Sequence, residues 1–193
     1  MNKIKFIIIL FGLLLFNSIK ADNIKPILDG NSSSVVNILL YESLTCSHCA
    51  NFHKEVLPGL KKNFIDKGLV SIQYKNFPLD LAALNASKLA HCRNDGKSNL
   101  LHYLYLNQAK WAKGKTIEEF NLNLKDTIET GGYQLDTTKC LNDESLEDHI
   151  LNDRVEGVKK YNINSTPTII INGKKFDKTL SYKNIKKAIE KLL

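Results

Sequence analysis

Two cysteines separated by two residues, in Cys46-Ser47-His48-Cys49, are the part of the sequence best suited to chemistry. This spacing lets the second thiol close a disulfide with the first, and the thiolate is the reactive form of cysteine. A helical pattern begins at Ser47, so we expect Cys46 at a helix N-terminus, where unpaired amides and the helix dipole stabilise negative charge. A protonated His48 would add positive charge beside the Cys46 sulfur. The motif predicts a redox-active pair with Cys46 as the nucleophile.

Two other interpretations of the motif stay open on the residues alone. The pair would also suit an inert structural disulfide, or half of a metal site in which His53 is a third ligand. No second CxxC or histidine pair completes a structural zinc site. The position of the pair after a β-prone segment and before a helix favours redox chemistry, and we expect no bound metal.

A second candidate motif, Thr166-Pro167-Thr168, stands directly before a β-prone segment. A proline at this place is often an ordinary strand-start residue, and a cis peptide bond is the less frequent alternative. Asn172-Gly173 follows and is a strong signal of a tight β-hairpin, because both turn positions need positive φ.

The hydrophobic pattern around these motifs predicts an α/β protein. The expected elements are, in chain order, a strand at 35–44, a helix at 47–67 with a kink at Pro58, a strand at 70–77, helices at 79–111 with a break at Gly96, 116–130, 137–141 and 146–161, strands at 168–171 and 174–177, and a helix at 181–193. Parallel strands need a crossover, which the helical stretch supplies. We therefore expect a mixed sheet with helices on both faces and an all-helical subdomain inserted at about 79–150.

The first 21 residues have the order of a secretory signal peptide. Lys3 and Lys5 precede an uncharged apolar run at 6–16, and a polar stretch then ends at Ala21. The apolar run is shorter than the roughly 20 residues of a membrane-spanning helix; a buried N-terminal strand and an uncleaved anchor are the alternatives. We expect 1–21 to be removed and 22–193 to form a single domain in the periplasm, where disulfides persist.

The formal net charge of +7 is spread along the chain. No basic stripe is interleaved with aromatic residues, so nucleic-acid binding is not expected. Trp111 is expected in the core, and His91, His102 and His149 are expected at the surface or packed between helices.

Five segments carry a resemblance to a known family: 41–49 (YESLTCSHC), 52–58 (FHKEVLP), 77–80 (FPLD), 165–168 (STPT) and 171–173 (ING). Together they resemble the DsbA family of thiol:disulfide oxidoreductases, most of all its alphaproteobacterial members, over about residues 31–193. The resemblance implies a thioredoxin fold in which Pro167 is cis and packs beside Cys46 and Cys49. It also implies that the backbone at Thr166 pairs with an extended substrate segment.

The activity that the resemblance implies is the introduction of disulfides into unfolded or reduced exported proteins by Cys46 and Cys49. The resemblance also implies reoxidation by a DsbB-like membrane quinone reductase. We expect a monomer that needs no cofactor beyond the redox-active disulfide. The alternatives are a disulfide isomerase or reductase of the same fold, and a periplasmic metal-binding protein that uses the CxxC as ligands.

One position departs from the family pattern. DsbA relatives commonly carry an acidic residue six positions before the first cysteine, where this chain has Leu40, and the nearest acid is Glu42. We therefore expect no buried carboxylate to move the proton of Cys49.

Cys92 and Cys140 both fall in the helical stretch. Some DsbA-like proteins have a second cysteine pair in similar places, and in an oxidising compartment we expect a structural Cys92–Cys140 disulfide. Two buried free thiols, packed as small apolar side chains, are the alternative.

Overall fold

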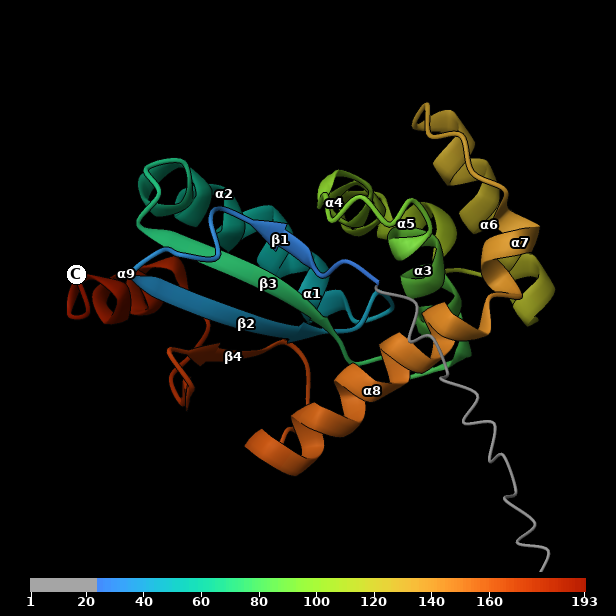
Figure 1. Ribbon diagram of the computed structural model, residues 1–193. Helices are drawn as coiled ribbons and strands as arrows, with labels where there is room; N and C mark the ends of the chain where they lie inside the picture. The colour runs from blue at the N-terminus through green and yellow to red at the C-terminus, as the bar shows by residue number, and fades with distance from the viewer. Residues whose placement is uncertain (1–23) are drawn as a thin grey trace, which may run out of the picture.

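The computed structural model describes residues 24–193 and is built around a five-stranded sheet (Figure 1). The strands are β1 (Ile27–Asp29), β2 (Val36–Glu42), β3 (Val70–Asn76), β4 (Thr168–Ile171) and β5 (Lys174–Lys175), in the spatial order β1-β3-β2-β4-β5. β2 and β3 are parallel, and the other neighbours are antiparallel. The mixed sheet that the sequence predicts is confirmed.

Helices make up most of the remaining chain. They are α1 (Ser47–Asn51), η1 (Phe52–Val56), α2 (Leu57–Leu60), η2 (Lys61–Ile65), α3 (Leu81–His91), α4 (Asn99–Leu106), α5 (Gln108–Trp111), α6 (Ile117–Thr130), α7 (Thr137–Leu141), α8 (Glu144–Tyr161) and α9 (Tyr182–Glu190). The first four form one helical run after Cys46, in which η1 and η2 are π-helical. Pro58 has no N–H to donate, and the irregularity expected there takes the form of the π-helical turn just before it.

Helices cover both faces of the sheet because the side chains of β2 alternate between them. Ile38 and Leu40 lie in the main core with residues of the helical run after Cys46 and of α9. Tyr41 points to the opposite face, in a smaller cluster with Ile163 and Ile170. α8 lies on that second face, where a Cβ at Gly157 would come within 2.7 Å of the Tyr41 ring. A glycine is therefore needed for α8 to lie this close to the sheet.

The helices α3 to α7 stand beside the sheet, and α8 leads the chain back to β4 (Figure 1). Trp111 is fully buried in the main core, as expected, and its indole N–H donates to the Leu104 carbonyl at 2.9 Å. Cys92 and Cys140 form a disulfide with a Cα–Cα distance of 5.6 Å, which ties the end of α3 to α7. The whole arrangement is the thioredoxin fold with a helical insertion.

The sequence predicts no strand before residue 35, but the structure has one, β1. Ile27–Asp29 pairs antiparallel with β3, with Ile27 opposite Tyr74. The Leu28 amide also donates to the Gly96 carbonyl at 3.1 Å, so the helical insertion covers the outer edge of this strand. Three residues are too few to show the alternating hydrophobic pattern of a strand. β1 is a strand because it pairs with β3.

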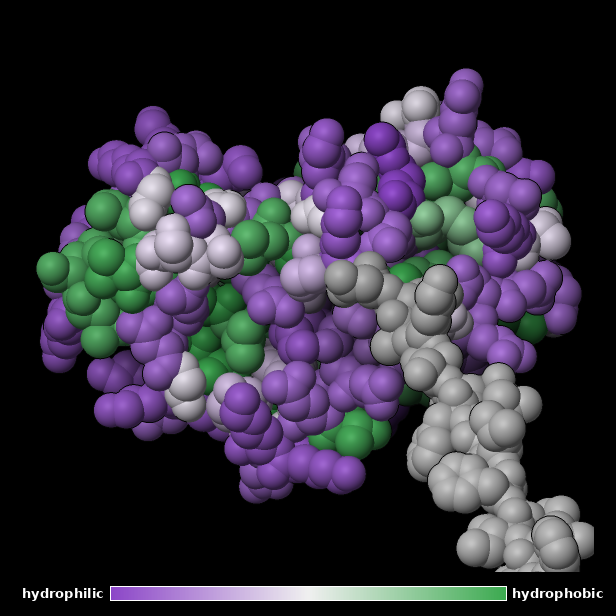
Figure 2. All heavy atoms as spheres, in the orientation of Figure 1, coloured by the Kyte–Doolittle hydropathy of each residue, from purple (hydrophilic) through white to green (hydrophobic). Residues whose placement is uncertain are grey.

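The predicted signal segment, 1–21, lies outside the described residues. Within 24–193, no helix combines the length and the apolar character needed to cross a membrane. Figure 2 shows a mostly polar surface, with an apolar area over α9, where Leu192 and Leu193 are exposed.

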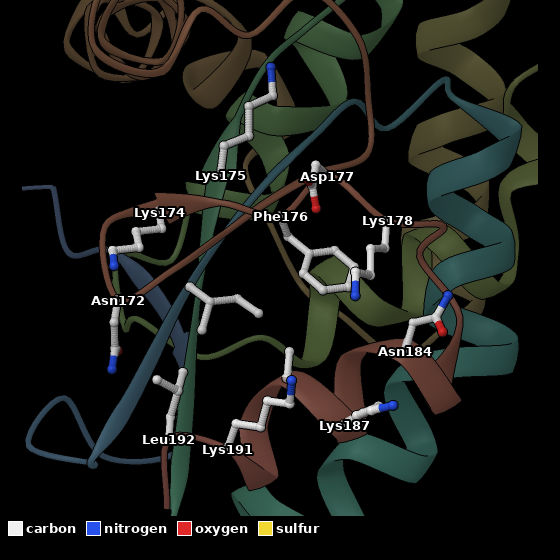
Figure 3. A pocket seen from close by; sticks show the side chains of 12 residues that line it. Asn172, Lys174, Lys175, Phe176, Asp177, Lys178, Asn184, Lys187, Lys191 and Leu192 are labelled. Atoms are coloured by element: carbon white, nitrogen blue, oxygen red, sulfur yellow. The ribbon is translucent and has the colours of Figure 1, made fainter.

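An open cavity of about 530 Å³ lies between the β4–β5 hairpin and α9 (Figure 3). Phe176 and Leu192 supply apolar walls, and Lys174, Lys187 and Lys191 stand around the rim. Neither cysteine of the CxxC lines this cavity. It is separate from the site described next.

Candidate active site

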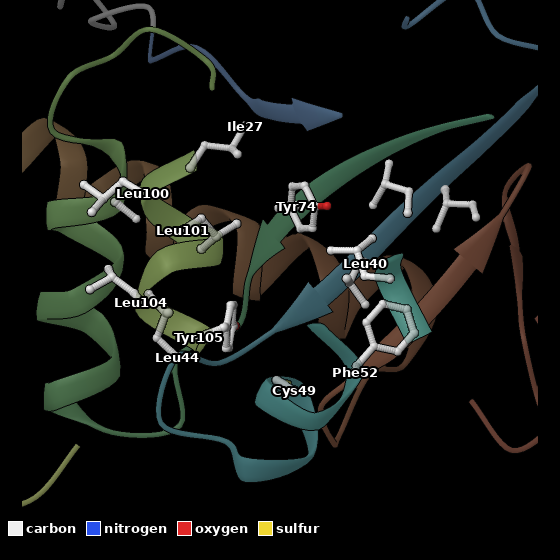
Figure 4. Close-up of a cluster of buried hydrophobic side chains, with 14 of the residues drawn as sticks. Ile27, Leu40, Leu44, Cys49, Phe52, Tyr74, Leu100, Leu101, Leu104 and Tyr105 are labelled. Carbon is white, nitrogen blue, oxygen red and sulfur yellow. The ribbon is translucent and has the colours of Figure 1, made fainter. Parts of the chain in front are cut away.

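The CxxC stands where β2 leads into the first helix of the chain. Cys46 is the N-cap residue of α1 and is partly exposed, whereas Cys49, one turn into the helix, is 0% exposed. Figure 4 shows Cys49 at the base of the core cluster that also holds Leu44, Phe52 and Tyr105. Both cysteines are free thiols. A substrate can therefore reach the sulfur of Cys46 but not that of Cys49.

The surroundings of Cys46 favour its thiolate. A hydrogen bond from the Cys49 thiol lowers the pKa of Cys46 to about 5, helped by the Thr166 hydroxyl and by the backbone amides of Cys49 and His48, against the opposing effect of burial. These amides are the unpaired donors of a helix N-terminus. The imidazole of His48 is exposed, so the contribution of its side chain stays a prediction.

Cys49 has the opposite electrostatic environment. Burial raises the pKa of the Cys49 thiol well above its ordinary value, and the hydrogen bond with Cys46 and the charge of Glu42 raise it further. The pair therefore combines one acidic, accessible thiol with one buried thiol that keeps its proton. This asymmetry suits a nucleophile and a resolving thiol.

The segment at Thr166 lies directly against the nucleophile. The Thr166–Pro167 peptide bond is cis, as the family resemblance implies. Cys46 Sγ donates to the Thr166 carbonyl at 3.4 Å. The Thr166 hydroxyl oxygen is buried and has no hydrogen-bond partner among the described residues. Its proton can therefore turn toward Cys46 when that sulfur is a thiolate, which is how the hydroxyl lowers the pKa of Cys46. The antiparallel pairing of β2 with β4 brings these two motifs together.

The loop before Cys46 is held by residues of the helical insertion that sequence reasoning missed. The Gln108 amide donates to the carbonyl oxygens of Leu44 (2.7 Å) and Cys46 (3.0 Å). The Thr45 hydroxyl donates to Asp80 at 2.7 Å. A glutamine in a helix gives no local signal of such a role, because its partners lie more than sixty residues away in the chain.

The expectation that no buried carboxylate is available to Cys49 is wrong, because Glu42 is buried and its charge acts on Cys49. Glu42 is buried, with 4% exposure, and its Oε2 lies 2.7 Å from His53 Nε2. Successive side chains of a strand point to opposite faces, so Glu42 shares the face of Leu40, where the family commonly has its acid. The acid of this chain therefore lies two residues after the usual position, and its side chain still points into the core. The period of the strand was the signal that could have predicted it.

The histidines have specific contacts, and His91 of α3 packs against His149 of α8, as expected of residues between helices. Both ring nitrogens of His53 have partners, Glu42 and His102, so His53 is not available as a third ligand for a metal at the CxxC. His102 is no simple surface residue, since it joins His53 to Asp29. His91 is buried and is in hydrogen-bond contact with Asn76. Over residues 24–193, no cluster of three or more histidine, cysteine or acidic side chains is arranged to hold a metal.

Comparison with known proteins places the chain in a family. Residues 22–191 match the family model described as thioredoxin. A candidate protein-disulfide oxidoreductase of Rickettsia typhi is 31% identical over 177 residues, which cover 90% of this chain and 64% of that protein. Disulfide bond formation protein D of Bacillus subtilis is 27% identical over 179 residues, which cover 88% of this chain and 77% of that protein.

The chain spans 52–64% of the length of the first three Rickettsia relatives. Among solved structures, alpha-DsbA1 of Wolbachia pipientis is similar, with a TM-score of 0.77 and 27% identity, over 86% of this chain and 90% of that one. The match to the family model, the sheet order and the placement of Cys46 beside Pro167 agree with one another. The chain therefore belongs to the thioredoxin family, and it is similar to DsbA-like proteins.

Proposed function

We propose that the protein is a thiol:disulfide oxidoreductase that introduces disulfides into exported proteins. The observation that carries this proposal is the asymmetry of the pair: the pKa of Cys46 is lowered to about 5 while that of Cys49 is raised. Stabilising the Cys46 thiolate stabilises the reduced protein, and this makes the disulfide form a stronger oxidant. The acidity of Cys46 therefore favours oxidation of substrates over their reduction.

The chemistry proceeds by two thiol–disulfide exchanges. A substrate thiolate attacks Cys46 Sγ in the oxidised pair, the Cys46–Cys49 bond breaks, and the electron pair leaves on Cys49, which takes up a proton. A second substrate thiolate then attacks the substrate sulfur of the mixed disulfide and releases Cys46 as a thiolate. The substrate loses two electrons and the protein gains them, so no cofactor beyond the disulfide is required.

A groove beside the pair suits an unfolded chain as substrate. It has a volume of about 380 Å³ and is lined by His48, Asn51, Phe52, Glu55, Val56, Thr166, Pro167, Thr179 and Leu180. Most of its surface is apolar, which favours the side chains that an unfolded protein exposes. The backbone at Thr166 would pair with the extended substrate, which is recognition by strand addition.

The setting of this activity is part of the same proposal. The signal-like segment at 1–21 would direct export to the periplasm, where disulfides persist. There the protein would act as a monomer on reduced or unfolded exported proteins. A DsbB-like membrane quinone reductase would reoxidise the Cys46–Cys49 pair.

The deciding experiment combines an equilibrium with glutathione and a stoichiometric reaction with a reduced, unfolded protein that has two cysteines. We expect a reduction potential closer to that of strong oxidants, about −120 mV, than to that of thioredoxin, about −270 mV. The Cys46→Ala variant should lose all exchange, and Cys49→Ala should accumulate mixed disulfides. A potential near that of thioredoxin, together with faster rearrangement of scrambled disulfides than formation of new ones, would contradict the oxidase and support an isomerase or reductase.

A further inference from the structure

A chain of hydrogen-bond contacts leads from the buried acid beside Cys49 to the edge of the helical insertion. Glu42 Oε2 lies 2.7 Å from His53 Nε2, His53 Nδ1 lies 3.0 Å from His102 Nδ1, and His102 Nε2 lies 2.9 Å from Asp29 Oδ2. The His53 side chain is 1% exposed, whereas that of His102 is 21% exposed. The chain therefore begins in the core and reaches solvent at His102.

Four separate elements contribute to this chain of contacts. Glu42 ends β2, His53 lies in η1, His102 in α4 and Asp29 at the end of β1. Aromatic rings exclude water along its inner part: the Tyr105 ring stacks on His53, with centroids 3.9 Å apart. Burial raises the pKa of the Tyr105 hydroxyl well above its ordinary value, so it does not compete as a proton donor.

The contact between the two Nδ1 atoms determines how many protons the chain holds. Two ring nitrogens at 3.0 Å need one N–H and one lone pair between them. Burial would raise the pKa of Asp29, but hydrogen bonds from His102, Ser98 and Tyr74 hold it well below its usual range. Asp29 is therefore a carboxylate, and His102 Nε2 carries a proton and donates to it.

Only three placements of one shared proton then satisfy every contact. The proton is on the Glu42 carboxyl, on His53 as an imidazolium, or on His102 as an imidazolium. All three have the same hydrogen bonds and differ only in which atom of each pair holds the hydrogen. A proton that enters at His102 can thus appear at Glu42 without any heavy atom moving far.

We propose that Glu42, His53, His102 and Asp29 form a path for the proton that Cys49 gains and loses during exchange, with His102 as its outer end. The inference rests on the proposed dithiol exchange and holds for either direction of that exchange. When the disulfide opens, the electron pair goes to the Cys49 sulfur and Glu42 gives it a proton. That proton has reached Glu42 along the chain: water protonates His102 at Nδ1, His102 passes this proton to His53 Nδ1, and His53 passes its Nε2 proton to Glu42.

Oxidation of the reduced pair runs the path in reverse. Cys49 must lose its proton to attack a mixed disulfide on Cys46, yet its pKa is raised and its sulfur is buried. The backbone of Ser43, the residue after Glu42, makes a hydrogen bond to the Cys49 sulfur, and the charge of Glu42 acts on the same thiol. Glu42 Oε1 is buried and has no hydrogen-bond partner among the described residues, so it can take this proton. The other titratable groups that face the path are Lys61 at Asp29, Tyr74 and Tyr105 at the two carboxylates, and Lys75 and His91 across a small cavity beside Glu42.

Glutathione disulfide separates the two steps of this chemistry in the reduced, full-length protein. Attack by Cys46 is bimolecular, and its observed rate is proportional to the concentration of glutathione disulfide. Attack by Cys49 on the resulting mixed disulfide is intramolecular, and its rate does not depend on that concentration. Acid quenching and mass analysis follow both. We expect His102→Gln to slow the intramolecular step about tenfold at neutral pH and to leave the first step unchanged. This is less than the roughly 100-fold or more of a group that transfers the proton directly, because His102 acts through His53 and Glu42.

His149→Gln is the matched control. His149 is also a partly buried histidine in ring contact with another histidine, His91. Among residues 24–193, no hydrogen bond or ring contact joins it to Glu42. Its substitution should leave both steps unchanged. In His102→Ala, added imidazole should restore the intramolecular rate, because the position is partly exposed and a free imidazole can occupy it and relay the proton.

A solvent isotope effect on the wild-type protein tests the path without any substitution. The intramolecular step should slow about twofold or more in heavy water, as expected for rate-limiting proton movement, while the first step should not. A wild-type intramolecular rate in His102→Gln, a loss in His102→Ala that imidazole fails to restore, or the absence of an isotope effect would each overturn the path. If the reduced protein fails to react with glutathione disulfide at all, the proposed function itself is wrong.

Discussion

The side-chain amide of Gln108 lies 3.0 Å from the carbonyl oxygen of Cys46, so a residue of the helical insertion holds the backbone of the nucleophile. The same amide reaches the Leu44 carbonyl. The insertion therefore does more than enlarge the core, because it fixes the loop from which Cys46 is presented.

Replacing Gln108 with Ala should lower the free energy of unfolding by about 1–3 kcal/mol, because two partly buried carbonyl groups lose their donor. Urea denaturation measures this loss. Asn123→Ala is the control, since the Asn123 amide also donates to a backbone carbonyl, that of Lys113, but at an exposed place. Equal losses in the two variants would show that Gln108 has no special role.

The stability of the reduced protein should depend on pH through Cys46. Its pKa is lowered to about 5 in the folded state, against about 8.5 for a free thiol. Thiolate stabilisation is thus fully present above about pH 8.5 and is lost as the pH falls through 5. The free energy of unfolding of reduced protein, compared with that of oxidised protein, should rise from pH 5 to about 8.5.

Above about pH 8.5 the raised pKa of Cys49 acts in the opposite direction, because the unfolded thiol ionises while the folded one keeps its proton. The difference between reduced and oxidised protein should therefore pass through a maximum near that pH. Denaturation of both forms across the range tests this, and a flat difference between pH 5 and 8 would contradict the assigned acidity of Cys46.

Thr166→Val should raise the pKa of Cys46, because it removes a hydroxyl that favours the thiolate. The reduced form loses stabilisation and the protein becomes a weaker oxidant. Thiolate absorbance reports the pKa, and equilibrium with glutathione reports the potential. Thr127→Val, whose hydroxyl donates to the Asn123 carbonyl far from the pair, should leave both values unchanged.

His48 contributes through two groups that substitution can separate. Its backbone amide lowers the pKa of Cys46 whatever the side chain is, whereas the exposed imidazole adds positive charge only when it is protonated. We expect His48→Leu to raise the pKa of Cys46 and to weaken the oxidant. If thiolate absorbance gives this variant the same Cys46 pKa as the wild type, His48 acts on that pKa through its backbone amide alone.

The Cys92–Cys140 disulfide closes a loop with a sequence separation of 48. In the chain-entropy model, its removal in a Cys92→Ala/Cys140→Ala variant should cost about 4 kcal/mol of unfolding free energy. Exchange at Cys46 should persist in the folded variant. In the wild type, mild reductant should expose two thiols only, at Cys46 and Cys49, and four reactive thiols would contradict a structural role.

The elements that depend on local signals could be predicted from the sequence. The buried strand before Cys46 and the Asn172-Gly173 turn each carry their pattern within a few residues, and both turn residues have positive φ in the structure. β1 could not be predicted in this way, because its three residues become a strand only through pairing with Ile72 to Tyr74 of β3.

The same limit applies to the site. The two cysteines and Thr166-Pro167 were identified by their motifs, whereas the contact between His53 and His102 joins residues 49 positions apart and has no local signature. The position of Glu42 could be predicted in part, because the two-residue period of a strand places its side chain on the same face as that of Leu40. The family pattern has its acid at the position of Leu40 only, so it does not identify Glu42, although the strand period predicts which face Glu42 occupies.

The lysine pair that forms β5 has a consequence for a protein whose proposed substrates are unfolded. Unfolded chains can pair with an exposed strand edge and aggregate there, and lysines on an edge strand oppose this pairing. Lys174 and Lys175 are both exposed on the last strand of the sheet, and at the other edge the Leu28 amide is already bound to Gly96. Both edges of the sheet are thus protected from pairing with the proposed substrates. The backbone at Thr166, beside Cys46, is the place where an incoming chain can still pair.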